Sequence, residues 1–133
     1  MTVNVKTNNN GKSLAETNQL PAVQTKTLTG TYNGSTITIY LYKYGSVVSA
    51  TINWVGAAAN GDGNKYLWFP NIPAGWRPGF KVRFSAEHIS GTSIVNAQCC
   101  TIYTIGTDGG VGVITNTDGR LERIASGSWV AVN

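Results

Sequence analysis

Charged side chains are scarce in this chain. They make up 12% of its 133 residues, against roughly 25% in an ordinary soluble domain. Ten Lys and Arg residues outnumber six Asp and Glu residues and give a formal net charge of +4. Proteins that bind nucleic acid usually concentrate positive charge in one stripe, and no stretch of this chain does so; we therefore expect no nucleic-acid partner. The excess charge serves either solubility or attraction to an anionic partner such as a phosphate-bearing polymer.

Groups that ligate metals or transfer protons are also few. Cys99 and Cys100 are adjacent, and no Cys or His spacing typical of a zinc site is present. His88 is the single histidine, and no serine stands in a nucleophile-elbow pattern. We therefore expect no metal, no cofactor and no enzymatic activity. The alternative is a saccharide-degrading enzyme that uses Glu87 and Glu122 as its carboxylate pair.

Long apolar runs are absent from the sequence. No run approaches the roughly 18 residues of a membrane span, so we expect no membrane insertion. Residues 1–21 are polar, lack the apolar stretch of a signal peptide and end at Pro21. We expect this segment to be a neck stub, a linker or an expression remnant. Residues 22–133 then form a single domain.

The residues that are abundant favour strands. Val and Ile outnumber Ala and Leu, and β-branched side chains suit a pleated surface. Apolar and polar residues alternate cleanly over 36–42, 48–54 and 81–88, and the first two runs form the strongest hairpin signal. Further short strands are expected at 66–69, 95–105, 111–115, 121–124 and 129–132, with turns at 107–110 and 116–119. The pattern predicts an all-β fold, a small antiparallel β-barrel or sandwich.

The aromatic residues divide between two environments. Trp54 lies on the apolar side of its expected strand and is predicted to be core, whereas Trp76 is predicted to anchor the irregular segment 73–79. Tyr40 and Tyr42 alternate with an apolar face and therefore lie on the opposite one. Two interpretations stay open for that second face. It binds sugar through its aromatic rings, or it is buried against another sheet or subunit.

A family resemblance rests on the order of several weak motifs between Pro21 and the last residue. They are Leu20-Pro-Ala-Val-Gln-Thr-Lys-Thr-Leu28, the hairpin ending at Trp54-Val-Gly56, Arg77-Pro78, His88-Ile-Ser-Gly91, Asn116-Thr-Asp-Gly119 and Gly127-Ser-Trp-Val-Ala-Val132. In this order and spacing, the chain resembles the carboxy-terminal head domain of receptor-binding proteins from lactococcal siphophage baseplates.

The resemblance implies a homotrimer of small β-barrel heads at the tail tip of a virion. Such heads bind saccharides of a Gram-positive cell wall without turning them over. The expected partners are therefore the host cell-wall polysaccharide, two further copies of the chain, and other baseplate proteins joined through the N-terminal neck. The expected location is the baseplate of the virion, acting at the host cell surface.

The resemblance implies that Trp, His, Asp and Arg side chains bind the sugar. We expect the site near the carboxy terminus, where residues of these types occur. The candidate saccharide-binding residues are Asp118, Arg120, Glu122, Arg123, Trp129 and His88. In this hypothesis Trp129 stacks on a sugar ring, the arginines reach hydroxyls or a phosphate, and the carboxylates accept hydroxyl hydrogens. The alternative is a terminal hairpin whose charges pair across strands.

Three other functions remain open from the sequence. The first is a structural baseplate or decoration protein, which forms trimers without receptor affinity. The second is the saccharide-degrading tail enzyme introduced above. The third is a free-standing lectin or carbohydrate-binding module, for which a stable monomer that binds sugar would be characteristic.

Overall fold

A computed structural model of the chain describes residues 22–32, 34–56, 69–90, 93–94, 101–115 and 121–132. These residues form eight strands: β1 (Gln24–Tyr32), β2 (Ser35–Tyr44), β3 (Val47–Gly56), β4 (Val82–Ser90), β5 (Ser93–Ile94), β6 (Thr101–Ile105), β7 (Val111–Thr115) and β8 (Leu121–Val130). They include no helix of the length and apolarity needed to cross a membrane. The described part of the chain is thus all-β, as the sequence predicts.

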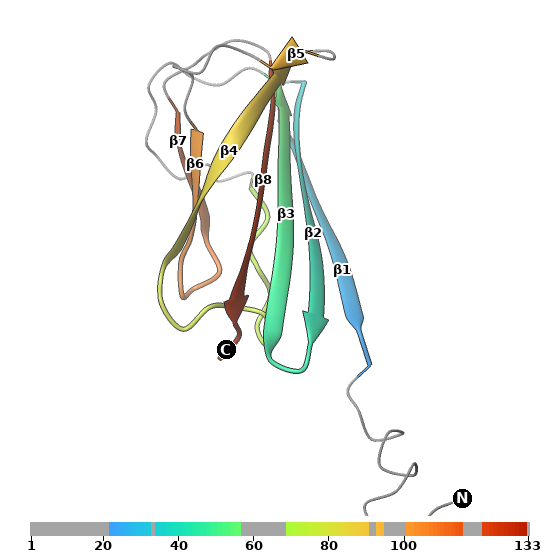
Figure 1. Cartoon of the computed structure of the whole chain (residues 1–133), viewed down its shortest axis with the longest axis vertical. Helices are drawn as coiled ribbons and strands as arrows, with labels where there is room; N and C mark the ends of the chain where they lie inside the picture. Colours follow the sequence, from blue (N-terminus) through green and yellow to red (C-terminus); the bar gives the residue numbers. More distant parts are fainter. Residues whose placement is uncertain are drawn as a thin grey trace, which may run out of the picture.

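All the strand pairings are antiparallel, in the order β1-β2-β3-β8-β4-β6-β7, with β5 beside β4 (Figure 1). Strand β4 changes neighbours along its length. Residues 82–86 pair with β6, and residues 87–89 pair with β8. The sheet therefore curls at β4, and its two arms close on a shared core as a half-barrel. The predicted all-β antiparallel fold is thus confirmed, with a half-barrel in place of a closed barrel or a two-sheet sandwich.

The core lies on the concave side of the curled sheet. Alternate residues of β2 and β3 point inward, including Ile37, Ile39 and Trp54, and the β6–β7 hairpin faces them with Tyr103 and Val113. The irregular segment 69–80 supplies the remaining core side chains, which are Phe69, Ile72 and Trp76. Burial of this apolar surface is the main stabilising contribution to such a fold. Trp54 is 1% exposed, which confirms its predicted place in the core.

Trp76 fixes the irregular segment to the sheet. Its carbonyl oxygen accepts a 2.7 Å hydrogen bond from Trp129 Nε1. The ammonium nitrogens of Lys26 and Lys43 lie 5.6 Å and 5.4 Å from the centroid of its ring, within the range of a cation–π interaction. Lys43 also donates to the carbonyl oxygen of Gly75. These contacts confirm the prediction that Trp76 anchors the loop.

The β2–β3 hairpin and the β6–β7 turn are confirmed, while two strand predictions need correction. The expected strands 121–124 and 129–132 are one continuous strand, β8, because residues 125–128 pair with 49–52 of β3 without interruption. Strand β1 was not predicted as a strand. The predicted neck at 1–21, the turn at 116–119, and Cys99 and Cys100 lie outside the described residues.

Candidate functional site

The predicted saccharide-binding residues do not form one surface cluster in the described part of the chain. Asp118 and Arg120 lie outside the described residues. Glu122 is half-buried on the outer side of β8, where its Oε2 accepts a 2.7 Å hydrogen bond from Asn53 Nδ2. The side chains of Arg123, Trp129 and His88 are buried. The described members of the set are therefore divided between the two sides of the sheet.

Arg123 has no exposed surface and serves the interior. Its Nη1 donates a 2.7 Å hydrogen bond to the carbonyl oxygen of Gly56, and its guanidinium carbon lies 4.6 Å from the centroid of the Trp54 ring. The hydroxyl of Tyr103 donates to the carbonyl oxygen of Arg123 at 2.7 Å. Burial raises the pKa of this tyrosine, so it stays a neutral donor. Arg123 thus ties β8 to the end of β3 from inside the core.

His88, on the neighbouring strand β4, is a further buried polar side chain beside Arg123. It is the register partner of Arg123, and its Nε2 shares a 2.7 Å hydrogen bond with Thr101 Oγ1. Thr101 in turn shares a 2.9 Å hydrogen bond with Thr115 Oγ1. Burial, and to a lesser extent the positive charge of Arg123, lower the pKa of His88. The histidine therefore serves as a neutral internal link between β4 and β6.

Trp129 is also engaged inside the domain. Besides its hydrogen bond to Trp76, its ring stacks on Phe84 with centroids 6.1 Å apart and planes inclined by 20°. It is 6% exposed, so its face is not free to receive a sugar in a single chain. The geometry of His88, Arg123 and Trp129 therefore lends no support to a saccharide role for these three side chains.

Glu87 and Glu122, the proposed carboxylate pair, lie on adjacent strands. Glu87 is the register partner of Ile124, and Glu122 is the partner of Ile89. They are thus diagonal neighbours across β4 and β8, a relation that separates residues by roughly 7–8 Å. Both face outward, away from the core. The fold brings the two carboxylates into one neighbourhood, which the sequence alone did not show.

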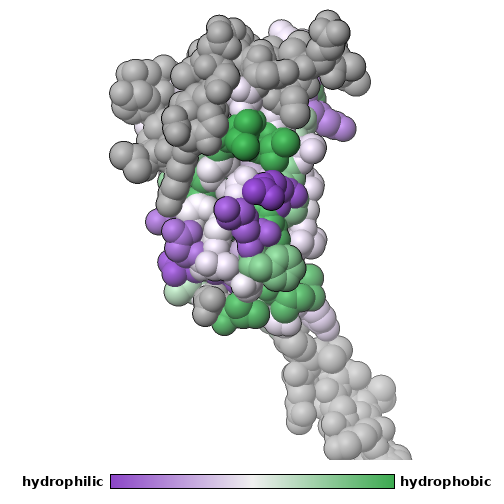
Figure 2. All heavy atoms as spheres, turned by 90° about the vertical axis from the view of Figure 1, so that its left-hand side faces the viewer, coloured by the Kyte–Doolittle hydropathy of each residue, from purple (hydrophilic) through white to green (hydrophobic). Residues whose placement is uncertain are grey.

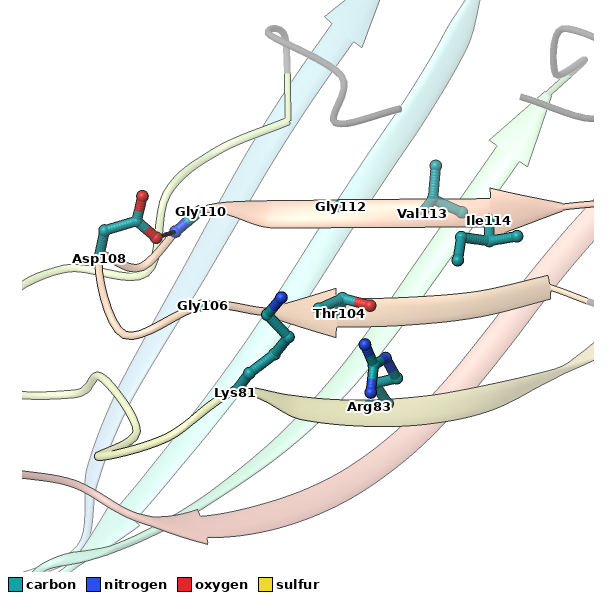
Figure 3. A pocket seen from close by; sticks show the side chains of 9 residues that line it. All are labelled: Lys81, Arg83, Thr104, Gly106, Asp108, Gly110, Gly112, Val113 and Ile114. Atoms are coloured by element: carbon teal, nitrogen blue, oxygen red, sulfur yellow. Dashed lines mark hydrogen bonds between the residues drawn. The ribbon is translucent and has the colours of Figure 1, made fainter. Parts of the chain in front are cut away.

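A hollow on the opposite arm of the sheet is a better candidate for a binding site. It measures about 310 Å³ and lies on the outer side of β4, β6 and β7 (Figure 3). We call it the cationic pocket; it is lined by Lys81, Arg83, Thr104, Gly106, Asp108, Gly110, Gly112, Val113 and Ile114. Figure 2 shows this side of the molecule, where hydrophilic residues lie between two hydrophobic areas.

The strand register explains how the pocket forms. Arg83 on β4 is the partner of Thr104 on β6, which is the partner of Gly112 on β7. The glycine provides no side chain at that point, and the long side chains of Lys81 and Arg83 extend from β4 toward β6 along the hollow (Figure 3). Asp108 closes one end, where its Oδ1 accepts a 2.8 Å hydrogen bond from the amide of Gly110. The resulting hollow has two positively charged side chains on one side, and backbone atoms form much of its floor.

The charge of the pocket favours an anionic ligand. Both Lys81 and Arg83 are exposed, and within the described ranges neither makes an ion pair with an acidic side chain. Asp108 offsets one of the two positive charges but is held against the turn. A guanidinium, an ammonium and the Thr104 hydroxyl are the donors with which proteins bind phosphate groups.

The sequence alone indicates only some of the features that form this pocket. The alternation over 81–88 places Lys81 and Arg83 on the outer face, and the turn at 107–110 sets the register of β6 and β7. The pairing of β4 with β6 joins segments distant in sequence, and no local pattern predicts it. No protein-family model and no curated protein matches the chain.

Proposed function

We propose that this chain is a non-catalytic receptor-binding head that attaches a phage virion to saccharides of a Gram-positive cell wall. The observation that carries the proposal is the cationic pocket, whose two cations have no acidic partner among the described residues and suit a phosphate carried by a wall polysaccharide. The resemblance of the sequence to lactococcal siphophage heads supports the same class. A rigid β scaffold with few charges is well suited to present such a site.

The described lining of the pocket supports the proposal of binding without turnover. Asp108 is the sole acidic residue among the described residues that line it, and its carboxylate accepts a hydrogen bond from the amide of Gly110. Glycoside hydrolysis requires two carboxyl groups that flank the scissile bond. The pocket supplies charge complementarity to an anionic saccharide, which raises the association rate and the specificity of binding.

One end of the molecule supports the proposed assembly into a baseplate. Strand β1 begins and β8 ends there, so the N-terminal segment joins the domain at this end (Figure 1). Exposed apolar side chains gather there: Val23, Tyr44, Val47, Phe80, Val130 and Val132. Apolar surface of this kind is typical of contact with another protein. In the proposal, copies of the chain associate as a homotrimer and meet other baseplate proteins at this end.

The proposal is tested by measuring mass and wall binding on the same purified chain. We expect light scattering to give a mass near three times 14.1 kDa and the protein to sediment with Gram-positive cell walls. A trimer without affinity for any wall would favour the structural baseplate protein instead. A stable monomer that binds sugar would favour a carbohydrate-binding module.

The placement of Glu87 and Glu122 favours one second candidate, a saccharide-degrading enzyme. The diagonal relation spaces their backbones roughly 7–8 Å apart, a distance from which two glutamate side chains can reach the roughly 6.5–9.5 Å between the carboxyl groups of inverting glycosidases. This candidate predicts that reducing sugar is released from wall polysaccharide, and that Glu87→Gln abolishes the release. Binding without release supports the receptor-binding head.

A further inference from the structure

The outer face of β1, β2 and β3 carries no charged side chain. We call it the tyrosine face. Its outward residues are Thr25, Thr27, Thr29 and Thr31 of β1, Thr36, Thr38, Tyr40, Tyr42 and Tyr44 of β2, and Val47, Ser49, Thr51, Asn53 and Val55 of β3. The lysines of these strands, Lys26 and Lys43, point to the other side and lie over Trp76. In a protein with a net charge of +4, this face is neutral.

Two tyrosines form the centre of this face. Tyr40 is 43% exposed and Tyr42 is 54% exposed, so no other described part of the chain covers them. Alternate residues of a strand are about 6.8 Å apart, and the two rings therefore follow one another along β2. Of the two interpretations of this face from the sequence, burial against a second sheet does not occur within the described part of the chain.

Hydroxyl groups flank each ring on both sides. The register places Thr27 and Thr51 beside Tyr40, on β1 and β3 respectively. It likewise places Thr25 and Ser49 beside Tyr42. A sugar ring stacked on either tyrosine would therefore meet donors and acceptors at both edges.

Some of these hydroxyls are held in place by the next strand. Ser49 Oγ lies 2.9 Å from Ser128 Oγ, and Thr51 Oγ1 lies 3.1 Å from Ser126 Oγ, both across β3 and β8. Hydroxyls that are already hydrogen-bonded lose less conformational freedom when a ligand arrives. The face thus offers fixed polar groups around rigid aromatic rings.

From these features we infer that the tyrosine face is a second binding site, for an uncharged saccharide chain that runs along β2. The apolar side of each tyrosine ring covers the C–H face of a pyranose, and the flanking Thr and Ser residues bond to its hydroxyls. An anionic ligand would lose hydration here without meeting a positive charge. The occupant is therefore distinct in charge from the ligand of the cationic pocket.

The inference shares with the proposed function the idea of a saccharide ligand, but it concerns the other arm of the sheet. Its experiment therefore uses purified oligosaccharides instead of cell walls. The full chain is titrated with cellotetraose, maltotetraose and laminaritetraose, and the tyrosine ring signals are followed by NMR. Failure of wall binding and failure of this site are then separate results.

Tyr44 provides a matched control on the same strand and face. It is 50% exposed, but its neighbours are Val47 on β3 and, beyond it, Val130 on β8. We expect at least one neutral tetrasaccharide to shift the rings of Tyr40 and Tyr42. Tyr42→Ala should weaken that binding about tenfold, while Tyr42→Phe, which keeps the ring, and Tyr44→Ala should change it by less than about threefold.

Three results would overturn the inference. The first is that no neutral tetrasaccharide binds more tightly than about 10 mM. The second is an equal loss in Tyr44→Ala and Tyr42→Ala, because the flanking hydroxyls would then contribute nothing. The third is a change of oligomeric mass in the folded Tyr40→Ala and Tyr42→Ala proteins, which would make this face a contact between copies of the chain.

Discussion

At the residue scale, two pairs of ionisable side chains differ in their environment: one pair is buried and the other is exposed. Arg123 and His88 face each other on β8 and β4, and both complete hydrogen bonds inside the core. Lys81 and Arg83 stand on the outer side with no such partner among the described residues. Only the second pair is available to a ligand in solution.

The lowered pKa of His88 predicts a dependence of stability on pH. An unfolded histidine titrates near 6.5, and the folded one accepts its proton only at lower pH because of burial and the charge of Arg123. The unfolded state therefore binds more protons between these two values, and stability falls as the pH drops below about 6.5.

Denaturant unfolding at about pH 7.5 and about pH 5 would measure this effect. The wild-type protein is expected to lose stability at the lower pH, and His88→Gln should remove that part of the loss. An unchanged pH dependence in His88→Gln would show that the histidine is not the group responsible.

At the element scale, the sequence predicted strands best where one face is buried and the other is not. The alternation in β2 and β3 follows directly from burial on the concave side, and Trp54 is correctly placed in the core by it. Strand β8 was expected as two strands, 121–124 and 129–132, but it runs without a break through Gly127, although glycine weakens a strand. The ring of Phe84 occupies the space above it, since a Cβ at Gly127 would lie 2.0 Å from Phe84 Cε1. A tertiary contact therefore requires glycine inside a continuous strand.

Strand β1 illustrates another limit of sequence reading. It is an edge strand, and only Leu28 and Gly30 among its residues of described burial are even half-buried. Without burial the apolar alternation is weak, and the strand is defined by its pairing with β2. The same limit applies to the cationic pocket, because its walls depend on the pairing of β4 with β6.

The tip of the β6–β7 hairpin offers a test of how the irregular segment is attached. Gly109 has φ +84° and its carbonyl oxygen accepts a 2.8 Å hydrogen bond from the amide of Ile72. A Cβ at this position would lie 2.3 Å from the carbonyl oxygen of Ile72. Gly75 has a similar φ of +86°, with nothing within 4 Å of its Cβ position.

We therefore expect Gly109→Ala to destabilise the protein more than Gly75→Ala. Both variants carry the strain of a positive φ, about 1–2 kcal/mol. Gly109→Ala must in addition move the backbone of residue 72 and weaken its hydrogen bond, at a further cost of about 1–3 kcal/mol. Denaturant midpoints of the two variants give the comparison. Equal destabilisation would contradict the close packing at the hairpin tip.

At the scale of the whole molecule, the two arms of the curled sheet present different surfaces. The outer face of the β1–β3 arm is neutral and rich in hydroxyls, whereas the β4–β6–β7 arm holds Lys81 and Arg83, which make no ion pair with an acidic side chain among the described residues. The end where β1 begins is apolar. A head that joins an assembly at one end and binds a phosphate-bearing wall saccharide on its side accounts for this distribution.

The most direct test of the cationic pocket is the binding of variants to isolated Gram-positive cell walls. Arg83→Gln removes a cation of the pocket, and Gly112→Val fills it without changing any charge. Gly112 faces outward between the buried residues Val111 and Val113 and has no positive φ, so its backbone conformation allows valine. Lys26→Gln is the matched control, because it also removes one positive charge. Lys26 is an exposed residue beside Trp76 on β1, at the opposite end of the strand order from the pocket.

The fraction of protein sedimented with the walls is the quantity to measure. We predict that Arg83→Gln and Gly112→Val each weaken binding about tenfold or more, as expected for the loss of a charged hydrogen-bonding partner or its space. Lys26→Gln should bind as the wild type does, and all three variants should show the cooperative unfolding of the intact fold. Equal binding by the wild type and Gly112→Val, or an equal loss in Lys26→Gln and Arg83→Gln, would contradict the assignment of the pocket as the receptor site.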